Sequence, residues 1–559
     1  MASLKETDTQ DQVNLSSHLR RMARMQPFKR AVCYPVKRDS RGRLAYSHLT
    51  FLQLEQESDC VARGMEKAGI LRGTRAFLMV KPGPEFFVLT FALFKVGAVP
   101  VLVEPAMGLK RILGCLKESE PEAFIGMPSA HILRKLYPGY FKSVKTCVTV
   151  GHSWFWGGRS LNEIRELPWR PYRIANTRKN EIAAILFTAG TTGTAKGTIY
   201  THGIFEAQLR HIKSHFLITP DEVDLPTFSF FALFDPALGM TAIIPDMDPT
   251  RPDKVDPDDI IEPILNQGVT NIFVSPGLLH RVGCYGKERG IKLPSLKRVI
   301  STGAPSAASS IEAFATMLRS DVEIHTPYGA TEAIPVSSIG SKEILSETKK
   351  LSEQGFGICI GRPLKGIEMR IIRILDEPIL SWSENLMVTD GDIGEIVVSG
   401  DLVTSRYYNR PRDEAFSKIR AADRIWHRMG DLGWKDTKGR FWFCGLKSHR
   451  VQTEKGTLFT IPCETVFNNH PEVHRSALVG VGELQNQTPV ICIELEGEKS
   501  KTEKHKIREE LLQLSRKNEQ TRHIQTILFP KSFPLDARDD TRILREKLAA
   551  WAEKQLQAP

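Results

Sequence analysis

The sequence lacks paired cysteines and a secretion signal. This pattern excludes a disulfide framework and favours reduced thiols in a cytoplasmic protein. The first twelve residues, MASLKETDTQDQ, are polar and do not show the charged-then-apolar order of a signal peptide. The nine cysteines are scattered singly, with no C-x-x-C pair and no histidine at metal-binding spacing: Cys33, Cys60, Cys115, Cys147, Cys284, Cys359, Cys444, Cys463 and Cys492.

The sequence also lacks an uninterrupted apolar run of membrane length. Its most apolar stretch, FFVLTFALFKVGAVPVLV at residues 86–103, contains Lys95, Gly97 and Pro100. A buried helix that runs into a buried strand explains these interruptions better than a membrane span. We therefore expect no integral membrane segment.

A strong charge of one sign is absent as well. The chain has 76 Lys and Arg against 65 Asp and Glu, which leaves a net charge of +11 over 559 residues. Basic residues are interleaved with acidic ones, as in EKSKTEKHK at residues 498–506. Because nucleic-acid-binding proteins usually gather positive charge on one face or arm, we expect no nucleic-acid partner.

Short apolar strands alternate with helical patterns through most of the chain, which predicts parallel sheets covered by helices. From about residue 355 the strands become shorter and the turns tighter, which indicates a small β unit. The fold class we predict is α/β, with a large N-terminal domain (residues 1–445) of two α/β subdomains plus the β unit, followed by a small, mobile α+β domain (residues 446–559). The strands that support this prediction lie at 183–187, 271–275, 297–301, 322–325, 394–400, 440–445, 476–481 and 489–495, with a helix at 501–517.

The strongest local signal is TAGTTGTAKG at residues 188–197, directly after a predicted strand. Small residues let backbone N–H groups approach an anion closely, hydroxyls add donors, and Lys196 supplies charge to phosphate oxygens. The spacing is not that of a Walker A loop, since two residues separate the second glycine from the lysine. The composition predicts a phosphate cradle, and a plain mobile turn is the alternative.

Four more segments follow along the chain: STGAP at 301–305, YGATE at 328–332, YYNRP at 407–411 and WHRMGD at 426–431. Together with the phosphate loop, and in the same order, they resemble the signatures of the acyl-adenylate-forming superfamily. That superfamily includes acyl-CoA synthetases, nonribosomal-peptide adenylation domains and luciferases. The resemblance spans nearly the whole chain and implies ATP-dependent, AMP-forming activation of a carboxylic acid.

The resemblance implies a site for ATP and Mg²⁺. The Tyr328 ring would stack on adenine, the Thr331 hydroxyl would bond the α-phosphate, and the Glu332 carboxylate would hold Mg²⁺. Asp431 would accept hydrogen bonds from the ribose hydroxyls, with a plain turn aspartate as its alternative. The implied catalytic set is Lys196, Thr331, Glu332 and Arg542, and the implied nucleotide-binding set is Thr188, Gly190, Thr191, Thr192, Gly193, Lys196, Gly303, Ala304, Pro305, Tyr328, Gly329, Thr331 and Asp431.

Three positions depart from the family pattern. The usual hinge arginine is replaced by Leu446, and the usual threonine before Gly-Asp is Met429. The family's late lysine, which bridges the substrate carboxylate and the α-phosphate, is replaced by Arg542. Arginine keeps the positive charge, but its planar fork points differently from an ammonium. If the register is shifted, Arg545 or Lys547 would take this role.

One branch of the family is similar over residues 223–252, 447–451 and 456–459: the β-lactone synthetases of bacterial long-chain olefin biosynthesis. This resemblance implies activation of a long-chain 2-alkyl-3-hydroxy fatty acid, whose own 3-hydroxyl then attacks the acyl-adenylate and closes a β-lactone. His427 and His449 are nearest to the motifs, but we expect both to be structural. In the first region we read Asp235, Asp246 and Asp248 as turn formers, and Phe228, Phe230, Phe231 and Phe234 as either core or an acyl channel.

Two other functions stay open at this level. The first is a ligase that joins a fatty acid to CoA or to an acyl carrier protein. The second is a nucleotide-binding relative that has lost adenylation, suggested by Leu446 and Arg542. Association with other enzymes of lipid metabolism is compatible with any of the three.

Overall fold

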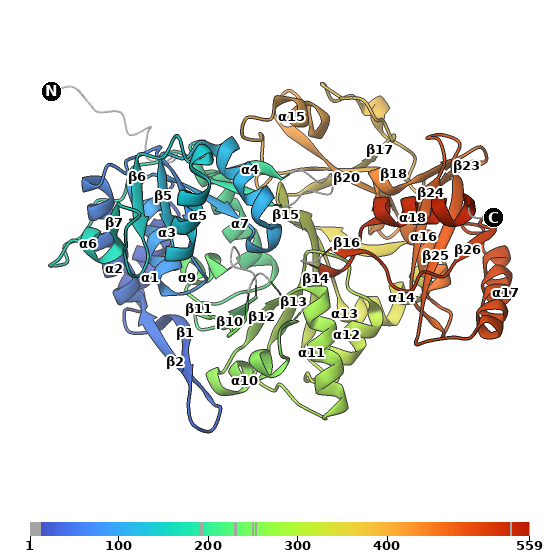
Figure 1. Cartoon of the computed structure of the whole chain (residues 1–559), viewed down its shortest axis with the longest axis horizontal. Coiled ribbons are helices and arrows are strands. Elements are labelled where there is room, and N and C mark those ends of the chain that lie inside the picture. Colours follow the sequence, from blue (N-terminus) through green and yellow to red (C-terminus); the bar gives the residue numbers. More distant parts are fainter. Residues whose placement is uncertain are drawn as a thin grey trace.

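The protein is described from a computed structural model. The structure describes residues 13–188, 195–227, 232–248, 251, 254–536 and 539–557. The side chains of residues 105, 536 and 539–542 are not described. Figure 1 shows a broad body that contains two sheets, with the C-terminal module at its right-hand end. The α/β class and the division into a large body and a small module agree with the prediction.

A seven-stranded sheet forms the first half of the body. All neighbouring strands run parallel except β8 and β9, which form a hairpin. The phosphate loop is the connection within this hairpin, so it links two strands instead of a strand and a helix. The strand order is β7 (Arg159–Ser160), β6 (Thr146–Thr149), β5 (Ala123–Gly126), β3 (Arg75–Met79), β4 (Val99–Val103), β8 (Ile182–Thr188) and β9 (Lys196–Thr201).

Helices cover both faces of this sheet. The inner face packs against the core that it shares with the second sheet, through α1 (Ser16–Met25), α2 (Phe51–Lys67), α3 (Pro84–Val96), α7 (His202–His215) and α9 (Phe234–Leu238). The outer face carries a separate apolar cluster beneath α4 (Leu109–Ser119), α5 (Pro128–Leu136) and the 3₁₀ turn η3 (Pro138–Tyr140). The short helix α6 (Leu161–Ile164) follows β7.

The apolar stretch at residues 86–103 is a buried helix, α3, followed by a buried strand, β4, as predicted. Gly97 ends the helix with a positive φ of 79°, a conformation that a side chain disfavours. Lys95 is fully buried, and its Nζ lies 2.7 Å from both Glu55 Oε2 and Asp59 Oδ1. In the part of the chain that the structure describes, no helix is long and apolar enough to cross a membrane.

The second sheet joins strands that lie far apart in the sequence. Its core is parallel, and β1 near the N-terminus pairs with β11 through Val32 and Ala242. Helices α10 (Asp258–Gln267), α11 (Pro276–Glu288) and α12 (Ala308–Ala315) connect its strands. The order of this part is β2 (Leu44–Thr50), β1 (Arg30–Arg38), β11 (Thr241–Ile243), β10 (Val223–Pro226), β12 (Asn271–Val274), β13 (Arg298–Ser301) and β14 (Glu323–Ala330).

The predicted β unit is present, but it continues the second sheet. The antiparallel pair β15–β16 joins the two parts through Ser337–Pro363 and Ser338–Arg362. Three short helices, α13 (Ser341–Glu343), α14 (Lys349–Glu353) and α15 (Pro411–Ser417), lie along this unit. Its strands are β15 (Ala333–Gly340), β16 (Ile358–Pro363), β21 (Phe441–Leu446), β20 (Ile425–Lys435), β18 (Gly394–Ser399), β17 (Glu368–Ile372) and β19 (Lys418–Arg420).

The C-terminal module has apolar clusters of its own. Helix α17 (Lys501–Lys517) has the predicted bounds, whereas the domain boundary after residue 445 stays a prediction and falls at the last residue of β21. The other elements are β22 (Val451–Thr453), β23 (Gly456–Leu458), α16 (Thr460–Phe467), β24 (Val473–Val481), β25 (Thr488–Leu495), β26 (Thr526–Leu528), β27 (Leu535–Asp536), β28 (Asp539–Ile543) and α18 (Arg545–Gln557).

Candidate active site

Two motifs that are a hundred residues apart meet at Tyr328 and Asp431. The Tyr328 hydroxyl donates to Asp431 Oδ2 at 2.5 Å, which links β14 to β20. Burial raises the pKa of Asp431 to about 7, with Glu395 and Glu332 adding to the effect, while the bond from Tyr328 opposes it. The aromatic ring and the carboxylate that the motifs predict for adenine and ribose are therefore neighbours.

The turn between β14 and β15 is fixed to the end of β8. The hydroxyls of Thr188 and Thr331 lie 2.8 Å apart, so the last residue before the phosphate loop contacts the turn directly. The Tyr200 hydroxyl donates to the Thr331 carbonyl. Gly329 leaves room for the returning strand, because a Cβ there would lie 2.5 Å from the Ala333 carbonyl oxygen. These contacts place the Thr331 hydroxyl beside the phosphate loop.

Tyr407 connects the acidic and basic groups of the site. Its hydroxyl donates to Glu332 Oε1 at 2.6 Å. The Lys196 ammonium lies 5.4 Å from the centre of the Tyr407 ring and 2.9 Å from Asp413 Oδ1. The hydrogen bond from Tyr407 engages one of the two carboxylate oxygens of Glu332. Lys196 is thus held near Glu332 by an aromatic ring and a carboxylate from the region of α15.

A second lysine, Lys418, also lies near the Tyr407 ring. It is buried, donates to the Thr404 carbonyl, and its Nζ lies 5.7 Å from the centre of the Tyr407 ring. Burial lowers the pKa of Lys418 to about 7, against the attraction of Glu332. The neighbouring His427 donates from Nδ1 to the Ser417 carbonyl at 3.1 Å, and burial keeps the pKa of its ring well below the usual range. The contact of His427 is structural, as expected.

The predicted adenine turn follows β13 and lies next to the Tyr328 strand. Gly303 has a positive φ of 102°, and the Thr302 hydroxyl donates to the Pro327 carbonyl at 3.4 Å. Gly303 and Pro305 are exposed and Ala304 is half-buried. This backbone is open to a ligand beside Tyr328.

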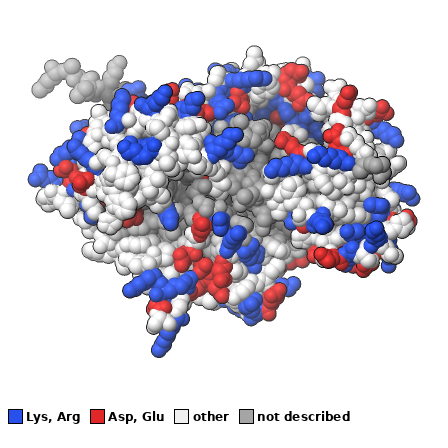
Figure 2. Space-filling model, in the orientation of Figure 1, with Lys and Arg blue, Asp and Glu red and all other residues white. Residues whose placement is uncertain are grey.

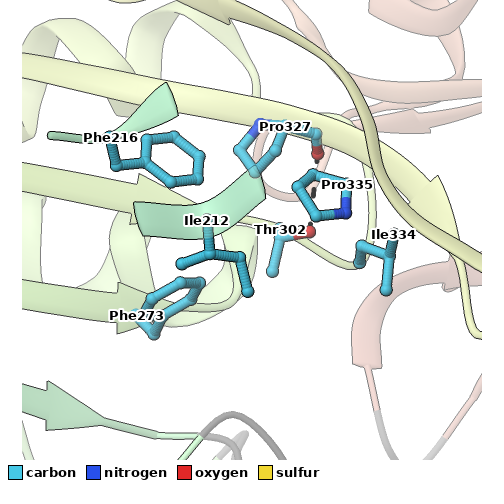
Figure 3. Close-up of a pocket in the computed structure, with 7 residues that line it drawn as sticks. All are labelled: Ile212, Phe216, Phe273, Thr302, Pro327, Ile334 and Pro335. Carbon is cyan, nitrogen blue, oxygen red and sulfur yellow. Dashed lines mark hydrogen bonds between the residues drawn. The ribbon is translucent and has the colours of Figure 1, made fainter. Parts of the chain in front are cut away.

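An apolar pocket lies beneath this turn (Figure 3). In the figure the Thr302 hydroxyl points to the Pro327 carbonyl at one end of the pocket, while apolar side chains form the other end. The residues that line it come from α7 and its C-terminal end and from the ends of β12, β13, β14 and β15: Ile212, Phe216, Phe273, Thr302, Pro327, Ile334 and Pro335.

Several predicted site residues lie outside the described ones. Gly190, Thr191, Thr192 and Gly193 of the phosphate loop are among them, as are Phe228, Phe230 and Phe231. Arg542 belongs to β28, whose backbone lies against α11, where Figure 1 shows a red segment reaching the green helix. Its side chain is not described. Phe234 is buried in the core against Phe205, 6.1 Å between ring centres.

The structure makes Arg545 a less favourable alternative to Arg542 for contacting the substrate carboxylate and the α-phosphate. Arg545 Nη2 donates to Glu464 Oε2 at 2.9 Å, and Nη1 donates to the Leu478 carbonyl at 3.1 Å. These bonds keep Arg545 within the C-terminal module. Lys547 is exposed on α18.

The two other departures from the family pattern border the Tyr328–Asp431 contact. Leu446 is the cross-strand partner of Asp431 in the β20–β21 pair. Met429 packs with Tyr328 against the apolar cluster of the β unit. An apolar pair therefore stands at the two positions where the motif resemblance predicts an arginine and a threonine.

Sequence reasoning missed several residues that shape the site. Tyr407 was part of a quoted motif, but its contact with Glu332 needs the fold, and Asp413 and Lys418 carry no local signal. The reading of Asp235 as a turn former is wrong, since Asp235 is buried in α9 beside Asp224 of β10. Burial raises the pKa of both carboxyls, that of Asp224 to about 7, and their mutual repulsion adds to the rise for Asp235.

The two-sheet body, the hairpin phosphate loop and the Tyr328–Asp431 and Glu332–Tyr407 contacts define a nucleotide-dependent, acid-activating type of enzyme. Residues 19–408 match the AMP-binding enzyme family, and the chain belongs to that family. It is thus an AMP-forming ligase that uses ATP.

Two curated relatives match almost the whole chain. It is 41% identical over 549 residues to the olefin beta-lactone synthetase of Xanthomonas campestris pv. campestris, covering 97% of this chain and 98% of the relative. It is 42% identical over 552 residues to the protein of the same name from Stenotrophomonas maltophilia, covering 97% and 99%.

Solved structures share the fold at low identity. The amide bond synthetase McbA from Marinactinospora thermotolerans superposes with a TM-score of 0.78 at 20% identity, covering 96% of this chain and 99% of that one. The O-succinylbenzoate coenzyme A synthetase MenE from Bacillus subtilis, in complex with AMP, gives a TM-score of 0.73 at 19% identity, covering 96% and 98%. These likenesses support the fold assignment.

Proposed function

We propose that the protein activates a long-chain 2-alkyl-3-hydroxy fatty acid with ATP and closes it to a β-lactone. The observation that carries the proposal is the 41% identity, over 97% of the chain, to a relative named olefin beta-lactone synthetase. The match runs through the C-terminal module as well as the body. It therefore covers the elements expected to take part in both half-reactions.

The first half-reaction forms the acyl-adenylate. The substrate carboxylate attacks the α-phosphorus of ATP, and pyrophosphate leaves. Tyr328 and Asp431 would hold the adenosine, the Thr188 and Thr331 hydroxyls would bond phosphate oxygens, and Lys196 would exchange Asp413 for a phosphate. Arg542 would approach the carboxylate and the α-phosphate from the C-terminal module.

Mg²⁺ fits the donor set at Glu332. Magnesium usually binds through one or two carboxylates together with substrate phosphates, and it keeps several waters. The bond from Tyr407 occupies Glu332 Oε1 and orients the carboxylate, which leaves Oε2 for the ion. When bound, the ion would neutralise charge on the phosphates. Among the described residues there is no cluster of three or more metal-ligating side chains that would hold the ion alone.

The second half-reaction needs no further substrate. The 3-hydroxyl oxygen attacks the acyl carbon, the bond from that carbon to the AMP oxygen breaks, and AMP leaves with the electron pair. The hydroxyl proton is released in the same step. Because the nucleophile is tethered to the acyl group, the enzyme has to orient it and exclude water.

Product analysis tests the proposal. Purified protein is incubated with Mg-ATP and a synthetic 2-alkyl-3-hydroxy acid, with and without CoA, and with the matched 2-alkyl acid that lacks the hydroxyl. We expect AMP and a product smaller than the hydroxy acid by one water, independent of CoA, and no such product from the matched acid. A thioester formed only with CoA would contradict lactone closure, and no AMP from any acid would contradict the choice of substrate.

The role of Arg542 has its own test. Arg542→Ala is expected to slow pyrophosphate exchange about a hundredfold, as loss of a transition-state contact does, with a smaller change in ATP affinity. Arg522→Ala, an exposed arginine of the same module, is the matched control. An unchanged exchange rate in Arg542→Ala would show that another cation takes this place.

A further inference from the structure

The outer face of the seven-stranded sheet has an unusual surface, formed by α4, α5, η3 and the loop at residues 150–158. We refer to it as the α4–α5 face. It carries a group of large apolar side chains that are exposed to solvent: Ile132, Leu136, Tyr137, Tyr140, Trp154 and Phe155. Soluble proteins expose single apolar residues routinely, but a group on adjoining elements marks an interaction site.

The aromatic tip of the loop is built into the fold. Trp154 is 68% exposed and Phe155 is 76% exposed. The next residue, Trp156, is buried, donates from its indole to the Thr149 hydroxyl at 3.0 Å, and stacks on the His131 ring at 5.8 Å. Arg134 of α5 donates to the Trp156 carbonyl. A buried anchor therefore presents Trp154 and Phe155 to solvent in a defined position.

Glycines shape the same loop. Gly151, Gly157 and Gly158 all have positive φ angles, and a Cβ at Gly158 would lie 2.7 Å from the Cys147 carbonyl oxygen. Gly158, which follows the aromatic tip, therefore packs directly against the backbone of β6. Its geometry favours the outward position of the two aromatic side chains.

The charge on this face is mostly positive, and the acidic residue of α4, Glu118, is paired with Arg410. Residues 127–160 contain five Lys or Arg and no Asp or Glu. Lys110 and Arg111 add exposed positive charge from α4. Figure 2 shows blue side chains beside uncharged surface over α4 and α5. The expectation that basic residues are interleaved with acidic ones is therefore wrong for this region, where part of the surplus of +11 is concentrated.

We propose that the α4–α5 face docks on the surface of an anionic phospholipid bilayer. Interfacial protein segments combine basic side chains, which meet lipid phosphates, with aromatic rings that sit at headgroup depth. Lysine and arginine near an anionic surface each add attraction, and the effect is screened by salt. This face supplies both features together. A nucleic acid would use the charge but leave the two aromatic side chains and the apolar face of α5 in water.

The aromatic loop of the α4–α5 face lies at the same end of the seven-stranded sheet as the phosphate loop. Helix α5 and the loop at 150–158 follow the carboxyl ends of β5 and β6, and β8 enters the phosphate loop at that end. Docking would hold the enzyme at a lipid phase, where long apolar acids partition. This last consequence rests on the proposed function, while docking itself does not.

Vesicle flotation of the full-length protein tests the proposal. Vesicles of phosphatidylcholine with phosphatidylglycerol are compared with vesicles of phosphatidylcholine alone, at low and high salt. We expect binding to the anionic vesicles to be at least about tenfold stronger and to weaken with salt. The double variant Trp154→Ser/Phe155→Ser, and separately Lys135→Gln/Lys142→Gln, should each reduce the partition coefficient about tenfold.

Matched controls lie in the C-terminal module. Leu484→Ser removes an apolar side chain that is 78% exposed, and Lys501→Gln/Lys506→Gln removes two exposed charges. Both should bind vesicles as the unaltered protein does, and circular dichroism checks that every variant is folded. Equal binding to both kinds of vesicle overturns the proposal, as does undiminished binding by the two α4–α5 variants. A loop variant that instead turns a dimer into a monomer in sedimentation would assign the face to a second copy of this chain, and this too overturns it.

Discussion

Replacing Tyr328 by phenylalanine removes one atom from the site and should change how ATP binding depends on pH. The Tyr328 hydroxyl lies 2.5 Å from Asp431 Oδ2 and stabilises the carboxylate. Burial raises the pKa of Asp431 from 3.8 to about 7. The folded protein therefore holds this proton more tightly than the unfolded chain, and the carboxylate that would accept the ribose hydroxyls forms as the pH rises through about 7.

The size of the effect follows from the lost hydrogen bond. A bond to a charged group contributes about 1.5–3 kcal/mol, and one pKa unit corresponds to about 1.4 kcal/mol. Tyr328→Phe should therefore raise the pKa of Asp431 from about 7 to about 8–9. At pH 7 the carboxylate fraction falls from about a half to about 1–10%, so the apparent affinity for ATP should fall about 5- to 50-fold. At pH 9.5 most of this loss should be recovered.

Calorimetric titration of ATP into the protein without acid substrate, between pH 6 and 9.5, measures how the apparent ATP affinity depends on pH. The phenyl ring of the variant keeps the stacking surface, so the pH dependence isolates the hydroxyl. Tyr285→Phe is the matched control, because its hydroxyl donates to Asp258 Oδ2 at 2.7 Å on the surface. If the affinity of Tyr328→Phe falls equally at every pH, or does not fall, the assignment of Asp431 to the ribose through its carboxylate is refuted.

Three further predictions concern single groups. Tyr407→Phe removes the donor that orients Glu332, so the Mg²⁺ concentration for half-maximal AMP formation should rise about fivefold or more, and an unchanged Mg²⁺ dependence would argue against Glu332 as the ligand. Lys95→Met removes a positive charge that neutralises two buried carboxylates and should lower the free energy of unfolding, measured in urea, by about 3–5 kcal/mol. The control Lys67→Met, which removes a surface ion pair, should lower it by about 1 kcal/mol or less. Burial raises the pKa of Asp224 in the folded state, so its contribution to stability is lost as pH rises from about 4 to 7 and above. Asp224→Asn should flatten the pH dependence of the urea midpoint over that range, and a parallel profile would count against the raised pKa of Asp224.

Much of the fold was predictable because local patterns and tertiary structure agree. The strands at 183–187 and 271–275 are short apolar runs between turn signals, and the helix at 501–517 has a complete capping box at Ser500 and Glu503. The pairing of β1 with β11 was not predictable, since these strands are about two hundred residues apart and no local sequence feature specifies which distant strand each will pair with. The junction of the β unit with the second sheet depends in the same way on backbone pairing between distant segments.

For the candidate site, too, the sequence revealed the local motifs but not the contacts between distant residues. The motifs around Lys196, Tyr328, Glu332 and Asp431 were visible in the sequence because phosphate, adenine and magnesium each require particular side chains at short spacing. The contact of Tyr407 with Glu332 needed the chain to be folded. The same holds for Asp413, which lies far along the chain from the lysine that it pairs with.

By itself, the sequence determined the family, the order of the elements and the residue types of the nucleotide site, because these depend on local spacing and composition. The tertiary structure decided which side chains meet, which carboxyls are buried deeply enough to change their pKa, and where positive charge and exposed aromatic residues come together. These properties arise from burial and from distances across the chain, and a net charge of +11 over 559 residues does not reveal that residues 127–160 carry basic residues without acidic ones.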